Sequence, residues 1–217
     1  MNMYAKLGYY SGLIAFIAAA GYSFVQILQV IRVVAFPLDA ILIYALSLCI
    51  TIPFLLSILT LHYVVPNDKK IWSHAALLFS VIYVTYVTLN YVVQLATVIP
   101  ASLRGTLDEI RILDQTPHSL FWNVDALGYI FLGLVTLFAY FVFKGSNEHK
   151  WLKWMLLANA LVTPLVSFVY FYPQFSYNLL LLGLPWIITA PGSMLLLALY
   201  FGKLMRMEKT QLARSQK

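Results

Sequence analysis

The residue best suited to chemistry is an acid inside an apolar stretch, Asp125 in the segment PHSLFWNVDALGY (residues 117–129). An ionised carboxylate in hydrocarbon costs several kcal/mol, so such a group normally faces the interior of a helix bundle. There it pairs with another group, binds an ion or ligand, or exchanges a proton. Asp125 is therefore the first candidate for a functional residue.

Other polar residues of the apolar stretches recur three or four positions apart, so they are expected to share helix faces. Asp125 lies in the outer half of the fourth predicted span. Arg32, at the outer end of the first span, is the only basic residue attached to the outer half of any span. We expect Asp125 to lie near Arg32, directly or through glutamine and asparagine side chains, in a cavity open to the outside. The candidate ligand-binding residues are Tyr22, Gln26, Gln29, Arg32, Asn90, Gln94, Asn123, Asp125 and Tyr129.

Several chemistries lack their usual residues. The sequence contains no HExxH motif, no GxSxG motif and no paired acidic motif, which disfavours zinc hydrolysis, serine hydrolysis and metal–pyrophosphate chemistry. The single cysteine, Cys49, excludes a disulfide framework and a cysteine-rich metal site. We predict no metal site, no cofactor and no catalytic set.

The composition sets the class of protein that must position these residues. Of the 217 residues, 62% are hydrophobic and 10% are charged, whereas soluble domains have about 45–50% and about 25%. A membrane-spanning helix needs about 20 mainly apolar residues. Six segments satisfy this requirement, and they predict an all-α, six-helix transmembrane bundle; they are residues 9–31, 40–61, 75–98, 120–143, 151–171 and 179–202.

The basic residues predict the orientation of this bundle, because cytoplasmic loops carry an excess of Lys and Arg. With the N-terminus inside, the inner segments hold 11 of the 14 Lys and Arg, namely Lys6, Lys69, Lys70, Lys144, Lys150, Lys153, Lys203, Arg206, Lys209, Arg214 and Lys217. Both termini are therefore expected to be cytoplasmic. The net charge of +6 reflects topology and not nucleic-acid binding.

The transmembrane domain is expected to cover residues 1–203, followed by a basic cytoplasmic tail over residues 204–217 attracted to anionic lipid. Residues 99–119 form the longest connection and are predicted to lie outside. Leu103, Leu107, Ile110 and Leu113 follow helical spacing there, which predicts one amphipathic helix on the membrane surface. This connector either rests on lipid or forms a lid over a site beneath it.

The start of the fourth span decides the depth of Asp125. Thr116 followed by Pro117 is typical of a helix start, since the hydroxyl caps free amides and proline loses no hydrogen bond at the first position. We therefore expect the helix to begin there. Proline also occurs within the spans, at Pro53, Pro164, Pro185 and Pro191, and broken helices in membranes often border binding sites.

The segments PHSLFWNVDALGYIFLGL, NDKKIWS and NYVVQLATVIPASL resemble those of a family of small bacterial multi-pass membrane proteins of uncharacterised function. The resemblance covers chiefly residues 67–137. It implies a bacterial inner-membrane location, and it implies no activity and no functional residue.

We expect a protein that binds or transports a small amphiphilic or lipid-like molecule in an outward-facing polar and aromatic cavity. Two other classes stay open: an enzyme acting on a lipid-like substrate with Asp125 as acid or base, and a structural or regulatory subunit of a membrane complex. Polar side chains also bridge membrane helices without any ligand. A substantial pocket beside Asp125 and Arg32 would favour binding, whereas a second titratable group within hydrogen-bond reach would favour catalysis.

Overall fold

The computed structural model describes residues 3–215, and within them the chain is helical with no strands. Six of the helices are long and apolar enough to cross a membrane, in agreement with the six predicted spans. These helices are α1 (Met3–Val30), α2 (Leu38–Val64), α3 (Lys70–Val93), α5 (Leu120–Phe143), α6 (Lys150–Phe171) and α8 (Trp186–Ser215).

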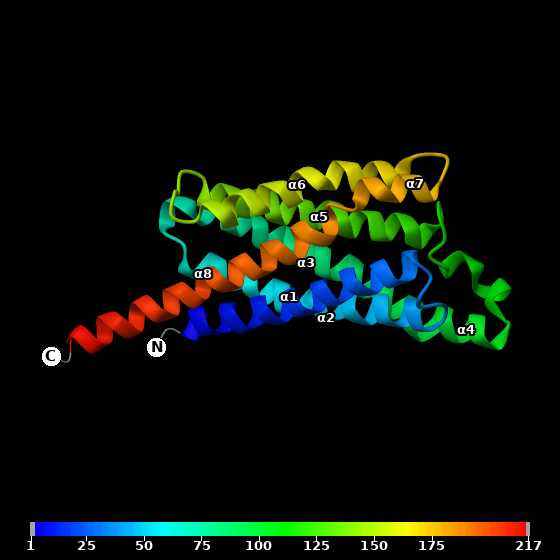
Figure 1. The fold of residues 1–217 in the computed structure, drawn as a ribbon, viewed down its shortest axis with the longest axis horizontal. Helices are drawn as coiled ribbons and strands as arrows, with labels where there is room; N and C mark the ends of the chain where they lie inside the picture. The colour runs from blue at the N-terminus through cyan, green and yellow to red at the C-terminus, as the bar shows by residue number, and fades with distance from the viewer. Residues whose placement is uncertain (1–2, 216–217) are drawn as a thin grey trace.

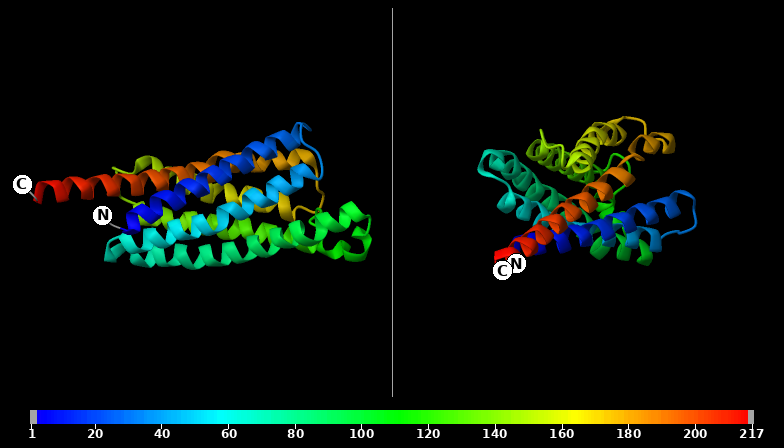
Figure 2. Two further views of the ribbon diagram at one scale, coloured as in Figure 1. Left: turned by 90° about the horizontal axis from the view of Figure 1, so that it is seen from below. Right: turned by 60° about the vertical axis from the view of Figure 1, so that its left-hand side comes forward.

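The six long helices form a closed ring. Each helix packs against the next along the chain, and α8 returns to pack against α1. The first turn of α1 and the last turns of α8 lie at one end of the bundle, which we call the terminal end (Figure 1). The short helix α4 (Ile99–Arg104) lies at the other end, which we call the connector end. Figure 2 shows the elongated bundle from two further sides.

Glycine allows two of these helix pairs to approach closely. A Cβ atom at Gly133 of α5 would lie 2.0 Å from Oγ1 of Thr163 on α6, far inside van der Waals contact. A Cβ atom at Gly12 of α1 would lie 3.1 Å from the backbone Cα of Ala198 on α8. Small residues at helix contacts are typical of membrane bundles, where packing drives association.

The third span continues beyond the predicted residue 98. A turn of π-helix, η2 (Gln94–Val98), joins α3 to α4, so the helical path ends at Arg104. Gly105 then takes a left-handed conformation with φ 74°. The 3₁₀-helix η3 (Leu107–Leu113) follows, with a kink at Ile110. The prediction of one amphipathic helix in this connector is therefore wrong, because Gly105 ends the first helical piece.

The fourth span begins three residues later than Thr116 and Pro117 suggested. His118 has φ 67°, in the left-handed region that a right-handed helix excludes. The N-cap is Ser119, whose Oγ accepts a hydrogen bond from the amide of Trp122 at 3.1 Å. Asp125 thus lies only about 8 Å along the helix axis from Leu120.

The sixth span is interrupted near the connector end. The short helix α7 (Tyr177–Leu180) and the 3₁₀-helix η4 (Leu181–Gly183) precede Pro185, and α8 begins immediately after it. The prolines Pro53, Pro164 and Pro191 lie inside continuous helices. At the other end, α8 extends as one helix to Ser215, through most of the predicted tail, and the last two residues of that tail lie outside the described residues.

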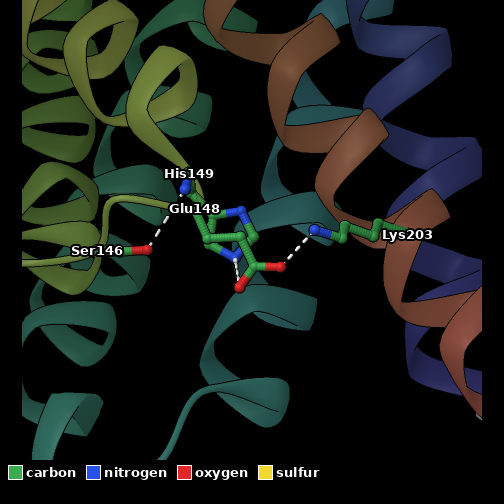
Figure 3. Close-up of polar contacts among 4 residues, drawn as sticks. All are labelled: Ser146, Glu148, His149 and Lys203. Carbon is green, nitrogen blue, oxygen red and sulfur yellow. Dashed lines mark hydrogen bonds and ion pairs between the residues drawn. The ribbon is translucent and has the colours of Figure 1, made fainter.

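At the terminal end, the loop between α5 and α6 is held to α8 by charged side chains (Figure 3). Glu148 pairs with Lys203 of α8 and lies 3.9 Å from the imidazole of His149. This hydrogen bond and charge from Lys203 lower the pKa of Glu148. Burial lowers the pKa of His149, so its imidazole favours the neutral form. These contacts close the ring at the end opposite Asp125.

Candidate functional site

The structure places Asp125 inside the ring, with 3% of its surface exposed. The hydroxyl of Tyr91 donates to its Oδ1 at 2.7 Å, and Nδ2 of Asn90 donates to the same oxygen at 3.3 Å. The hydroxyl of Tyr170 donates to Oδ2. The donors come from α3 and α6, the two neighbours of α5 in the ring. The expectation that Asp125 faces inward is confirmed, and the two adjacent helices solvate its carboxylate.

The connector covers this carboxylate from the connector end. Asn90 also donates to Oε1 of Gln115 at 3.0 Å, so one amide group links Gln115 to Asp125. Gln94, in the π-helical turn, donates to the carbonyl of Leu113 at 2.8 Å and accepts from the amide of Gln115 at 3.3 Å. π-Helical turns are frequent at functional sites. Gln94 and Asn90 therefore hold the last residues of the connector over the Asp125 site.

Aromatic side chains form the next layer toward the centre of the bundle. The hydroxyls of Tyr22 on α1 and Tyr129 on α5 are 3.0 Å apart, which joins opposite sides of the ring. The indole of Trp186, at the start of α8, lies nearly perpendicular to both rings, at interplanar angles of 76° and centroid distances of 5.4 and 5.2 Å. The ring of Tyr129 also contacts that of Tyr170, at 5.6 Å.

A cavity lies between the carboxylate and these rings. Its volume is about 20 Å³, counted as the space that the centre of a water molecule can reach. This is room for one or two water molecules. Its lining residues are Ser47, Ile50, Tyr83, Val87, Tyr91, Asp125, Gly128, Tyr129, Leu132 and Trp186. A cavity therefore lies beside Asp125, but it is smaller than the substantial pocket that the sequence analysis named as favouring ligand binding. A larger ligand would require the surrounding helices to separate.

The structure does not bring Arg32 to Asp125. Arg32 lies in the turn after α1, is exposed and has φ 58°. Among the described residues, no hydrogen bond or ion pair joins it to Asp125. The physical reason is the ring order, in which α1 packs chiefly against α2 and α8, whereas α5 packs against α3 and α6. The predicted pairing is therefore wrong.

The remaining predicted residues divide into two groups. Gln26 donates to Gln29 at 3.3 Å, and Gln29 donates to Oδ2 of Asp39 at 2.8 Å, so both serve the α1–α2 turn and not the cavity. Asn123 is exposed. The residues that gather at the site are Tyr22, Asn90, Gln94, Asp125 and Tyr129.

The candidate residues named from the sequence omit several contributors to the site, among them Tyr170, which donates to Oδ2 of Asp125. Tyr91 donates to the carboxylate, Ser47 lines the cavity and Gln115 lies over it. Tyr91 was detectable, because Tyr83, Val87 and Tyr91 are spaced by four and all three line the cavity. Gln115 was not detectable, since its position depends on how the connector folds back.

A second polar network has a structural role closer to the terminal end. Asn159 of α6, 1% exposed, donates to Oγ1 of Thr136 on α5 at 3.3 Å and accepts from the hydroxyl of Thr189 on α8 at 3.0 Å. Each of its contacts bridges two helices and involves only neutral groups. The network therefore ties α5, α6 and α8 together, as polar residues commonly do in membrane bundles.

Comparison of the chain with protein-family models, with curated proteins and with solved structures gives no match. The function has to be argued from the geometry of the Asp125 site itself.

Proposed function

We propose that the protein binds, and moves across the membrane, a small molecule at the Asp125 cavity. The observation that carries this proposal is a carboxylate buried among hydrocarbon and aromatic side chains whose three direct partners are all neutral. Intramembrane acids in such positions commonly mark substrate or ion pathways. The aromatic walls suit a molecule with an apolar part and one polar end.

The surrounding architecture supports movement as well as binding. Transporter sites are typically bordered by interrupted helices. Here α8 begins after the break at Pro185 with Trp186 against the cavity, and a π-helical turn follows α3 directly beyond Asn90. The cavity is small in this form, so we take it as a closed state in which the connector seals one end. Opening would separate Gln94 and Asn90 from the connector residues that they hold.

The proposed setting is a bacterial inner membrane, with the terminal end of the bundle in the cytoplasm and the Asp125 site toward the outside. The distribution of basic residues supports this orientation. Six spans bring α1 and α8 back to the same end, as the orientation requires.

Native mass spectrometry of the full-length protein purified in detergent tests the proposal. We expect a small molecule to co-purify with the wild-type protein and to be lost from the Asp125→Asn variant. Asp39→Asn is the matched control, because Asp39 is another buried acid near the connector end that does not line the cavity. An identical ligand profile in the wild-type protein and the Asp125→Asn variant would contradict the proposal.

A further inference from the structure

The cavity beside Asp125 combines one negative charge with a wall of aromatic rings. Four of its ten lining residues are aromatic, namely Tyr83, Tyr91, Tyr129 and Trp186. Asp125 is the only acid among the described lining residues, and none of them is basic. From this combination we infer that the ligand carries a primary ammonium group that pairs with Asp125. This inference rests on the proposed function and names its ligand class.

The Asp125 carboxylate is the first reason to expect a positively charged ligand. Three neutral side chains, those of Tyr91, Tyr170 and Asn90, lie within hydrogen-bond distance of the Asp125 carboxyl group. These donors solvate the negative charge without neutralising it. Buried charges in proteins are normally paired with an opposite charge. A cationic group in the adjacent cavity provides that pairing.

The aromatic rings of the cavity are the second reason to expect a positively charged ligand. A cation over the face of a tryptophan or tyrosine ring gains about 2 kcal/mol or more when both are removed from water. Trp186 and Tyr129 are fixed at a ring-centroid distance of 5.2 Å by their mutual packing and by the contact of both with Tyr22. The rings are therefore held in position before a ligand arrives.

The size and shape of the cavity select the kind of cation. Room for one or two water molecules fits an –NH₃⁺ group, which is close to water in size, and is too small for a quaternary ammonium. Ile50, Val87 and Leu132 make part of the wall hydrocarbon, whereas a hard metal cation needs several oxygen ligands. Among the described residues, no group of three His, Cys, Asp or Glu side chains is placed to hold a metal ion.

Asn90 contacts the Asp125 carboxylate without lining the cavity, and it holds an acceptor that has no partner in the described part of the chain. Its Nδ2 is committed to Asp125 and Gln115, while its Oδ1 is buried without a hydrogen-bond partner among the described residues. A buried acceptor without a partner costs about 1–3 kcal/mol. A primary ammonium has three N–H donors and can use more than one acceptor.

The test measures the melting temperature of the full-length protein in detergent against the concentration of added cation, at constant ionic strength. We expect methylammonium to stabilise the wild-type protein and Asp39→Asn, and to bind Asp125→Asn about tenfold more weakly or worse. Tetramethylammonium and sodium serve as size and charge controls, and we expect at least about tenfold weaker binding of each. Stabilisation by either control equal to that by methylammonium would overturn the inference.

Two further sets of binding measurements complete the test. If Asp125→Asn does not fold, Trp186→Leu takes its place and is expected to weaken methylammonium binding about tenfold, since it removes the ring face; an unchanged affinity would overturn the inference. Butylammonium and ammonium are compared with methylammonium. Tighter binding of methylammonium or butylammonium than of ammonium supports the inference, and equal or tighter binding of ammonium would overturn it.

The inference and the proposed function fail separately. A neutral or anionic molecule that co-purifies with the wild-type protein and is lost in Asp125→Asn overturns the ammonium inference and leaves the proposed function intact. A protein that binds neither a co-purified molecule nor any added cation overturns both.

Discussion

The hydroxyl of Tyr91 on α3 donates a hydrogen bond to Oδ1 of Asp125 on α5, with 2.7 Å between the two oxygen atoms. Tyr170 reaches the other carboxylate oxygen from α6. The acid is thus retained in an apolar bundle because both neighbouring helices solvate it, and not because a basic residue neutralises it. The same arrangement makes the carboxylate available to a positively charged ligand.

Loss of the Tyr91 hydroxyl should weaken the bundle. We expect Tyr91→Phe to lower the free energy of unfolding by about 1.5–3 kcal/mol, the usual range for a hydrogen bond to a charged group. Unfolding by SDS in mixed micelles measures this. Tyr86→Phe is the matched control on the same helix, because the Tyr86 ring stacks on Phe131 and its hydroxyl makes no hydrogen bond among the described residues. An equal decrease in the free energy of unfolding in the two variants would show that the hydrogen bond from Tyr91 to Asp125 does not stabilise the bundle.

Gln94 should control the mobility of the connector. Gln94→Leu removes the contacts with the Leu113 carbonyl and the Gln115 amide, so we expect faster hydrogen exchange at residues 113–116. Exchange measured by mass spectrometry reports this directly. Asn123→Leu is the control, since Asn123 is exposed and leaves the connector untouched. Unchanged protection of these residues in Gln94→Leu would mean that other contacts hold the connector in place.

The close approach of α5 and α6 should depend on Gly133. A methyl group there would overlap Thr163, so Gly133→Ala is expected to lower the free energy of unfolding by about 1–3 kcal/mol. Gly192→Ala should cost less, because its nearest neighbour is the flexible side chain of Met155 at 3.1 Å. The second substitution Thr163→Gly removes the overlapping atoms and should restore part of the loss in Gly133→Ala. Failure of this rescue would place the strain elsewhere.

The contact between Glu148 and Lys203 should respond to pH. The pKa of Glu148 is lowered in the folded protein, so the contribution of the pair is complete above the unfolded-state pKa. It is lost as the pH falls through the lower folded-state pKa. We expect spin labels at Asn147 and Met207, both exposed positions, to show a broader distance distribution at about pH 3 than at about pH 6. In Glu148→Gln the distribution should be independent of pH; a persistent pH response would assign the effect to His149, whose pKa is lowered by burial toward the same pH range.

The sequence predicted the six spans and the inward direction of Asp125, because hydrophobic length and the cost of a charge in hydrocarbon are local properties. It did not predict which helices solvate the acid, since this depends on the ring order that places α5 between α3 and α6. Arg32 was assigned as the partner because it was the only basic residue at a suitable depth. The structure instead uses neutral donors, Tyr91 and Asn90 from α3 and Tyr170 from α6, whose pairing with Asp125 depends on how the helices pack.

A structure of the protein in lipid nanodiscs, determined by electron cryomicroscopy at a resolution that shows side chains, tests the central claim most directly. We predict that the Asp125 carboxylate lies inside the ring in contact with Tyr91 and Tyr170, with non-protein density in the adjacent cavity. An Asp125 side chain that points to lipid or to bulk solvent, with the cavity filled by protein atoms, would contradict the claim.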